Sequence, residues 1–314
     1  MRKSSLVLSA IAILGAACAD EAIGAPDADP AREAGDTAPK APSPPTSTEP
    51  ADRFVLDVAP RTPLRPTSMT VTAETIDVAG LSREYVLATP DGVAESYPLV
   101  LVLHPDTMDA SSMRAAVRFE RISWQDAIVA YPSGLDRTWD LYAPSDTNPD
   151  EAFLVALVDS LKARLPVDQV FGMGFSSGAF MLSQLACRRP SLFRAIAPSA
   201  GGAPYEPFDP DAGRWENGYV RCAGQSPGSG PAVMIVHGTA DDVVGFDSGD
   251  FSARYWAYVN GCEPTRSAPV SPPPCVMHDG CPAERPVVFC AIDGLGHSVW
   301  GEATTAAWAF FRSL

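Results

Sequence analysis

Val170-Phe-Gly-Met-Gly174-Phe-Ser176-Ser-Gly178 is the stretch of sequence that decides the fold. Its first four residues are apolar and predict a buried strand, and a helix is predicted over Ala179–Cys187. Between the two lies the pattern G-x-S-x-G. In a strand-turn-helix context this pattern forms an elbow so tight that only residues without bulky side chains fit at Gly174 and Gly178, and the turn lifts the serine hydroxyl clear of the sheet. Ser176 is therefore the predicted nucleophile.

Around this elbow, from about residue 66 onward, short apolar runs alternate with amphipathic stretches. The alternation predicts an α/β fold with a mostly parallel central sheet and helices on both faces, and ligands bind at the carboxyl ends of such strands. A helix over Asp150–Leu165 is preceded by Asn148-Pro149, which is typical of a capped N-terminus. The other predicted strands are Leu99–Leu103, Ile128–Tyr131, Ala195–Pro198, Ala232–Val236 and Val287–Ile292, and the other predicted helices are Ser252–Val259 and Thr304–Phe311.

A serine hydroxyl becomes a useful nucleophile only with a base in hydrogen-bond reach, and the base needs a carboxylate that orients it. His104 and His237 each end a predicted strand, where a histidine commonly braces a loop, and His278 lies in a cysteine-rich loop. His297 follows the last strand on a loop that contains glycines. It is the predicted base.

The predicted acid follows the strand Ala232–Val236, where Asp241 and Asp242 stand side by side. A serine, then an aspartate, then a histidine is the chain order of one large class of hydrolases. We prefer Asp241 as the acid, and Asp242 remains the alternative.

Attack by serine on a carbonyl creates an oxyanion that needs backbone N–H donors. One predicted donor is the N–H of Ser177, directly after the nucleophile. The other comes from the loop after Leu99–Leu103, where the N–H of Asp106 is the candidate because Pro105 has none.

The first residues predict export. Arg2 and Lys3 precede the apolar run Leu6–Ala17, which is too short to span a bilayer and fits a secretory signal peptide over residues 1–19. Two processing outcomes stay open: cleavage after Ala19, or lipidation of Cys18 in a lipobox-like sequence. Residues 20–65 are rich in Pro, Ala and acidic residues and predict a disordered linker before a catalytic domain over 66–314. The expected location is extracellular or in the cell envelope.

The net charge of the chain limits the kinds of partner that it is expected to bind. The 314 residues include 23 Lys and Arg against 38 Asp and Glu, a net charge of −15, so a basic surface for nucleic acid is not expected. Membrane contact is expected only through a lipid on Cys18. Hydrophobic residues make up 46% of the chain, which is enough for a sizeable core.

Six cysteines remain once Cys18 is set aside, and in an exported domain they favour three disulfides. The preferred pairing among the 15 possible ones is Cys187–Cys222, Cys262–Cys290 and Cys275–Cys281. A metal site formed by Cys275, His278 and Cys281 is the alternative.

These motifs resemble the secreted esterases that include polyhydroxybutyrate depolymerase-like proteins, feruloyl esterases and acetylxylan esterases of carbohydrate esterase family one. The resemblance runs from about Arg83 to Trp308 and is carried by Tyr97–His104, Tyr131–Gly134, Thr138-Trp139, Gly174–Gly178, Cys187–Phe193, Ala197–Gly201, His237–Asp241 and Gly296-His297. It implies an α/β-hydrolase fold, a Ser176, Asp241, His297 triad and ester substrates, and the mechanism requires no metal or organic cofactor.

One departure from that group concerns the oxyanion loop. The group usually has His-Gly followed by a small residue or Cys, whereas this chain has His104-Pro105-Asp106. A carboxylate that pointed toward the developing negative charge would be unfavourable.

Aromatic residues suggest a substrate. Trp139, Trp215 and Trp300 are candidates to stack on an aromatic acyl group or a sugar, and the irregular stretch Gly201–Pro231 is expected to form a lid or pocket wall. Feruloyl or acetyl esters on plant polysaccharide are the first choice, and a polyhydroxybutyrate-type polyester is the alternative. A surface-tethered carbohydrate-binding protein with a decayed catalytic site is an alternative of another class, and a peptidase on the same scaffold is a third.

Overall fold

The computed structural model describes residues 69–92, 94–204, 222 and 228–314, all of which belong to one compact unit, Pro50–Leu314. The predicted leader and linker lie outside the described residues. So do Trp215 and most of the expected lid.

Ten strands of the described chain form one sheet in the order β1-β2-β4-β3-β5-β6-β7-β10-β9-β8. From β4 to β10 all neighbouring strands are parallel, and antiparallel pairs close the two edges. The strands are β1 Met69–Val78, β2 Leu81–Pro90, β3 Tyr97–Leu103, β4 Ile128–Pro132, β5 Val167–Phe175, β6 Ala195–Ser199, β7 Ala232–Gly238, β8 Ser267–Pro269, β9 Cys275–His278 and β10 Val287–Ile292.

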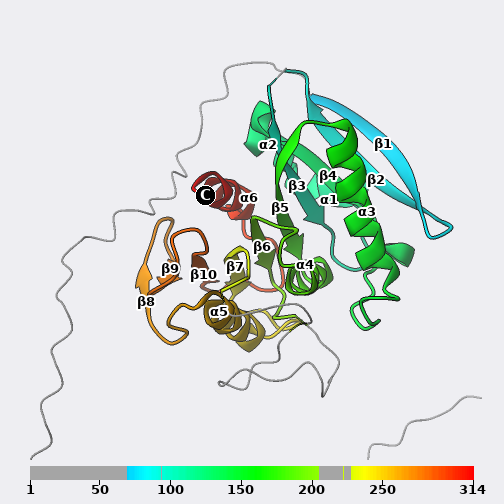
Figure 1. Ribbon diagram of the computed structural model, residues 1–314. Coiled ribbons are helices and arrows are strands. Elements are labelled where there is room, and N and C mark those ends of the chain that lie inside the picture. The colour runs from blue at the N-terminus through cyan, green and yellow to red at the C-terminus, as the bar shows by residue number, and fades with distance from the viewer. Residues whose placement is uncertain (1–68, 93, 205–221, 223–227) are drawn as a thin grey trace, which may run out of the picture. The chain divides into compact units, whose positions relative to one another are not determined.

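Helices cover both faces of the sheet, as Figure 1 shows. The helices are α1 Ala110–Val117, α2 Phe119–Ser123, α3 Pro149–Arg164, α4 Ser177–Arg188, α5 Phe246–Asn260 and α6 Ala303–Arg312. One buried cluster joins the sheet to α3, α4 and α5, and a second joins its other face to α1, α2 and α6. The predicted mostly parallel sheet with helices on both faces is confirmed.

The beginning of α3 follows from its cap. The side chain of Asn148 accepts hydrogen bonds from the N–H groups of Asp150 and Glu151, and Pro149 occupies the first turn, where its missing N–H costs nothing. Five large apolar side chains of the helix are buried against the sheet: Phe153, Leu154, Leu157, Val158 and Leu161. The predicted helix over Asp150–Leu165 is confirmed with its bounds shifted by one residue.

An ion pair between Arg83 of β2 and Asp150 of α3 closes the loop between β4 and α3. Both side chains are 2% exposed. The same guanidinium donates to the carbonyls of Ser133 and Pro149, each at 3.1 Å, and lies 4.1 Å from the ring centroid of Phe153. Because the two ends of the loop are held by one side chain, residues 133–149 are kept beside the carboxyl end of β4.

The two edges of the sheet were not predicted. β1 is mostly exposed along its length and pairs with β2 in a hairpin, so its side chains carry little apolar periodicity. At the other edge, β8 and β9 lie inside a Pro-rich and cysteine-rich stretch that reads as loop. Both features match the way edge strands differ from buried parallel strands.

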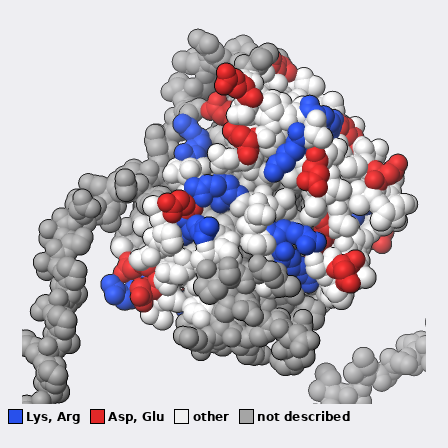
Figure 2. Space-filling view, viewed as in Figure 1, with Lys and Arg blue, Asp and Glu red and all other residues white. Residues whose placement is uncertain are grey.

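The surface in Figure 2 carries acidic and basic side chains interspersed with each other. Among the described residues, we find no helix that is both long enough and apolar enough to cross a membrane.

Candidate active site

The elbow between β5 and α4 has the geometry that its sequence predicts. Ser176 has φ of 53° and ψ of −123°, a backbone conformation that is strained for a residue with a side chain. A Cβ added to Gly174 would lie 2.4 Å from the carbonyl oxygen of Gly178, and one added to Gly178 would lie 2.5 Å from that of His104. Only glycine fits at both positions, and the elbow is packed directly against the loop that follows β3.

Ser176, Asp241 and His297 come together above the carboxyl ends of β5, β7 and β10. His297 Nε2 lies 3.0 Å from Ser176 Oγ, and His297 Nδ1 lies 2.8 and 3.0 Å from the two carboxylate oxygens of Asp241. The carboxylate can only accept, so Nδ1–H donates to it and Nε2 is free to accept the serine proton. This is the geometry of a nucleophile, a base and an orienting acid.

The loops that carry the acid and the base are bonded to each other. Thr239 N–H donates to Ile292 O at 2.9 Å, and Ala240 N–H donates to Leu295 O at 3.0 Å. A Cβ added to Gly238 would lie 2.1 Å from Leu295 O, so glycine is needed where the loops touch. Parallel pairing of β7 with β10 therefore continues past the ends of the strands and fixes the acid relative to the base.

Asp241 is buried, and burial alone would raise the pKa of its carboxyl. The hydrogen bond from His297 and those from the N–H groups of Val244 and Val243, at 2.9 and 3.0 Å, outweigh burial and hold that pKa below its ordinary value. Asp241 is thus an ionised acceptor. The neighbouring Asp242 is exposed, and the carboxylate that contacts His297 is that of Asp241.

The loop after β3, which carries the candidate oxyanion donor Asp106, is held by the loop after β4. His104 Nε2 accepts from Gly134 N–H at 2.9 Å, and its Nδ1–H donates to Pro105 O at 2.7 Å, so both ring nitrogens are used. Thr107 N–H donates to Arg137 O at 2.8 Å. As expected for a histidine at a strand end, His104 braces a loop.

The Asp106 carboxylate has its own partner in this arrangement. Thr138 Oγ1 donates to Asp106 Oδ1 at 2.6 Å. The carboxylate is therefore held by the loop after β4 through this hydrogen bond.

Trp139 does not form the substrate platform that the sequence suggested. Its side chain is 3% exposed, and its Nε1–H donates to His104 O at 2.7 Å. The indole ring lies against the His104 ring, with centroids 4.8 Å apart. Trp139 therefore braces the loop after β3. Trp300 is partly buried among apolar residues near α6, and Trp215 lies outside the described residues.

Two of the three predicted disulfides are wrong. Cys187–Cys222 is confirmed, but the other pairs are Cys262–Cys281 and Cys275–Cys290. Antiparallel pairing of β9 with β10 puts Cys275 directly opposite Cys290, and the chain after β9 returns Cys281 to Cys262, which lies two residues beyond the end of α5.

The alternative metal site at Cys275, His278 and Cys281 loses two ligands, because both thiols are in disulfides with other partners. Among the described residues no group of three or more His, Cys, Asp or Glu side chains is arranged to hold a metal ion.

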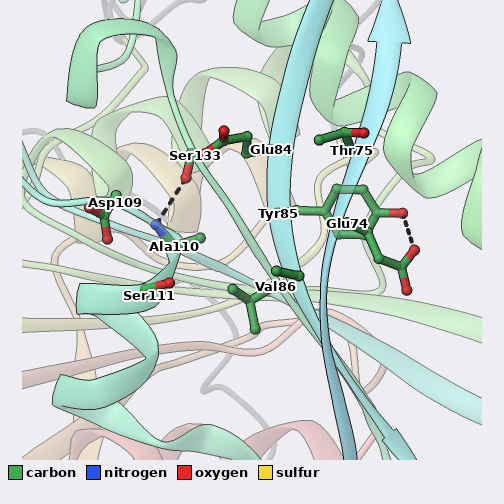
Figure 3. Close-up of a pocket in the computed structure, with 10 residues that line it drawn as sticks. Glu74, Thr75, Glu84, Tyr85, Val86, Asp109, Ala110, Ser111 and Ser133 are labelled. Carbon is green, nitrogen blue, oxygen red and sulfur yellow. Dashed lines mark hydrogen bonds between the residues drawn. The ribbon is translucent and has the colours of Figure 1, made fainter.

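A cavity of about 600 Å³ lies away from the triad, between the β1–β2 hairpin and the N-terminus of α1 (Figure 3). Tyr85 Oη donates to Glu74 Oε2 at 2.7 Å, and burial together with this carboxylate raises the pKa of Tyr85 to about 12. On the opposite wall Ser133 Oγ accepts from Ala110 N–H at 3.0 Å. Both of these hydrogen bonds are made within the cavity wall.

Sequence reasoning missed three groups that shape the site. Val243 and Val244 contribute backbone N–H groups to Asp241, and Thr138 contributes the hydroxyl that holds Asp106. Backbone donors leave no signal in the sequence. The Asp-x-x-Val spacing after His-Gly is compatible with a turn in which the aspartate accepts from the following N–H groups.

Curated relatives identify the kind of protein to which this chain is similar. It is 32% identical to feruloyl esterase C of Emericella nidulans over 253 residues, which are 74% of this chain and 84% of the relative. It is 31% identical to probable feruloyl esterase C of Aspergillus terreus over 231 residues, 68% of this chain and 76% of the relative. No family model matches the chain.

Solved structures agree on the fold. Acetyl xylan esterase from Aspergillus awamori superposes with a TM-score of 0.63 at 19% identity, over 77% of this chain and 99% of that one. Est1E from Butyrivibrio proteoclasticus with ferulic acid bound superposes with a TM-score of 0.50 at 16% identity, over 76% and 98%. The fold is that of α/β-hydrolase esterases.

Proposed function

We propose that this chain, which belongs to the feruloyl esterase C family of carboxylic ester hydrolases, cleaves its substrates through an acyl-enzyme on Ser176. The single observation that carries the proposal is the 3.0 Å contact between His297 Nε2 and Ser176 Oγ. A serine so placed has a base within the distance that general-base catalysis needs.

In the first half of the reaction Ser176 Oγ attacks the ester carbonyl carbon while its proton moves to His297 Nε2. The proton then passes to the oxygen of the leaving alcohol as the carbon–oxygen bond breaks, which leaves an acyl-enzyme. Asp241 accepts from Nδ1–H throughout and stabilises the imidazolium.

In the second half a water molecule takes the place of the alcohol. His297 removes its proton, the hydroxyl attacks the acyl carbon, and the proton returns to Ser176 as the carboxylic acid leaves. The N–H groups of Ser177 and Asp106 are the proposed donors to the oxyanion in both halves. Packing of Gly178 against His104 O supports this pair, because it brings the start of α4 and the loop after β3 together.

The proposed substrates are feruloyl or acetyl esters carried by plant polysaccharide. The identity to feruloyl esterase C supports the feruloyl choice. Trp300 follows His297 by three residues and, with Trp215, remains a proposed contact for an aromatic acyl group or a sugar.

Two measurements test the proposal separately. Labelling by a fluorophosphonate is expected for the wild-type protein and is expected to vanish in Ser176→Ala, with Ser177→Ala as the matched control that keeps the label. Labelling that persists in Ser176→Ala would overturn the nucleophile. Turnover is then compared on methyl ferulate, acetylated xylan and hydroxybutyrate oligomers. Turnover of the oligomers alone would replace the proposed substrate class with a polyester.

Export through residues 1–19 is part of the proposal. Three disulfides in the described chain support it, because such bonds persist in oxidising compartments. The mass of the N-terminal peptide of the mature protein decides between cleavage after Ala19 and a lipid on Cys18. A mature protein that retains Met1 would contradict export by this route.

A further inference from the structure

A second histidine lies beside the triad acid. His237 is the sixth residue of β7 and is 1% exposed. Its Nε2 lies 2.8 Å from Val244 O and 3.5 Å from Asp241 Oδ2. The shorter distance is a hydrogen bond of ordinary length, so Nε2–H donates to the Val244 carbonyl. This leaves Asp241 Oδ2 to the 2.8 Å bond with His297.

The bond from His237 holds the turn on which the acid depends. Val244 N–H donates to Asp241 Oδ1 at 2.9 Å, while the carbonyl of the same residue accepts from His237. Val244 is therefore fixed through both its amide and its carbonyl. Val243 N–H, which also donates to Asp241 Oδ1, belongs to the same turn. Loss of the His237 bond would free the carbonyl end of this turn, and with it the two donors that orient the carboxylate.

The imidazole itself has little freedom to move. A Cβ added to Gly249 of α5 would lie 2.4 Å from His237 Nδ1, so the helix backbone packs directly against the ring. The ring of Phe246 meets it edge-on with centroids 6.2 Å apart. Among the described residues Nδ1 has no hydrogen-bond partner. The ring is thus packed between β7 and α5, and its hydrogen bond runs from Nε2–H to the carbonyl of Val244.

We propose that His237 is a positioning residue of the ester hydrolase: its Nε2–H bond to Val244 O locks the turn that presents Asp241 to His297. This inference rests on the proposed serine mechanism. His237 touches neither substrate nor the reacting atoms, so it acts only through the acid.

The test compares two substitutions at the same site. His237→Leu removes the donor and keeps an apolar side chain, whereas His237→Gln can place its amide N–H near the position of Nε2. We expect His237→Leu to lower kcat by about 10- to 100-fold with KM nearly unchanged, because a misplacement of about 1 Å costs on the order of 100-fold. We expect His237→Gln to recover most of the loss.

The matched control is His278→Leu. His278 is also buried and its Nδ1–H donates to a backbone carbonyl, that of Glu263. It is the last residue of β9 and, because β9 is antiparallel to β10, it lies toward the amino end of β10, whereas His297 follows the carboxyl end. We expect this variant to keep the wild-type kcat. If His237→Leu does not fold, Gly249→Ala displaces the ring and leaves its donor in place, and the same fall in kcat is expected.

Two outcomes separate the inference from the proposed function. If the wild-type protein takes no fluorophosphonate label, the serine mechanism itself fails. If the wild-type protein is labelled and folded His237→Leu is labelled at the same rate with the same kcat, the mechanism stands and the positioning role of His237 is overturned. Loss of kcat in His237→Gln as deep as in His237→Leu would also overturn the role assigned to the Nε2–H bond.

Discussion

Thr138 donates its hydroxyl to the carboxylate of Asp106 at 2.6 Å and so joins the loop after β4 to the loop after β3. This hydrogen bond bears on whether the carboxylate of Asp106 would oppose the negative charge of the oxyanion. A negative charge beside a developing oxyanion would slow attack, and the hydrogen bond to Thr138 constrains the carboxylate of Asp106, whose backbone N–H is the proposed oxyanion donor.

Thr138→Val tests this partnership, because valine keeps the shape of threonine and lacks the hydroxyl. We expect kcat to fall by about 3- to 10-fold, since both side chains are exposed and their bond is partly screened by solvent. Asp106→Asn in the Thr138→Val background removes the charge and is expected to restore kcat. A double variant no better than Thr138→Val would argue against a role for the charge.

Trp139→Phe tests whether Trp139 supports the loop after β3 or contacts the substrate. The variant leaves the buried His104 carbonyl without its donor, which is expected to lower the free energy of unfolding by about 1–3 kcal/mol. KM for methyl ferulate should stay near its wild-type value if Trp139 does not touch substrate. Trp308→Phe is the control, since its buried Nε1 has no partner among the described residues and no hydrogen bond is lost. A large rise in KM with an unchanged free energy of unfolding would show instead that Trp139 contacts substrate.

Asp241→Asn and Asp242→Asn resolve the alternative between the two neighbouring aspartates. In Asp241→Asn the amide cannot orient and charge-stabilise His297 as the carboxylate does, and kcat is expected to fall by about 10⁴-fold, by analogy with other triads. Asp242 is exposed and is expected to tolerate the change with activity near wild type. Steady-state kinetics on one ester substrate measures both, and equal effects would contradict the assignment.

Burial lowers the pKa of His104 below its ordinary value of 6.5, although the carbonyl of Pro105 and nearby carboxylates oppose the shift. The unfolded chain therefore binds a proton at a higher pH than the folded chain does. Between the lowered folded pKa and 6.5 the free energy of unfolding is expected to rise with pH and to fall on acidification.

Urea unfolding over a pH series checks this dependence in the wild type and in His104→Gln. The variant has no group to titrate at this position, so its stability should change less steeply below pH 6.5. His278→Gln serves as the comparison, because burial also lowers the pKa of His278. An unchanged slope in His104→Gln would show that His104 does not supply the pH dependence.

The disulfides give a prediction that needs no activity assay. Peptide mapping without reduction is expected to recover Cys187–Cys222, Cys262–Cys281 and Cys275–Cys290. Replacing Cys275 and Cys290 together by alanine is expected to lower the free energy of unfolding by about 2–5 kcal/mol. A peptide that joins Cys262 to Cys290 would contradict the pairing found in the structure.

The sequence was most informative where one residue type is required. Gly174 and Gly178 have no alternative at the elbow, and Asn148-Pro149 marks the beginning of α3, so both features could be predicted. The proximity of Ser176, Asp241 and His297 could also be predicted, because each follows a strand whose carboxyl end had to lie at the same edge of the sheet.

The remainder depends on contacts between distant segments. The pairing of Cys275 with Cys290 follows from the register of β9 against β10, and β9 itself carries no clear strand signal. The role of Trp139 was predicted incorrectly, because the sequence does not distinguish an indole that stacks on a substrate from one that supports a neighbouring loop. Only the position of the His104 carbonyl decides between them.

The order of β5, β7 and β10 along the chain determines when, during synthesis on the ribosome, the candidate active site can form. Ser176, the proposed nucleophile, is synthesised first, Asp241 about 65 residues later and His297 about 56 residues after that. β10 must pair with β7 before His297 can reach Asp241. In a nascent chain whose β10 has not yet paired with β7, Ser176 would lack its proposed base, so the proposed ester cleavage requires that pairing first.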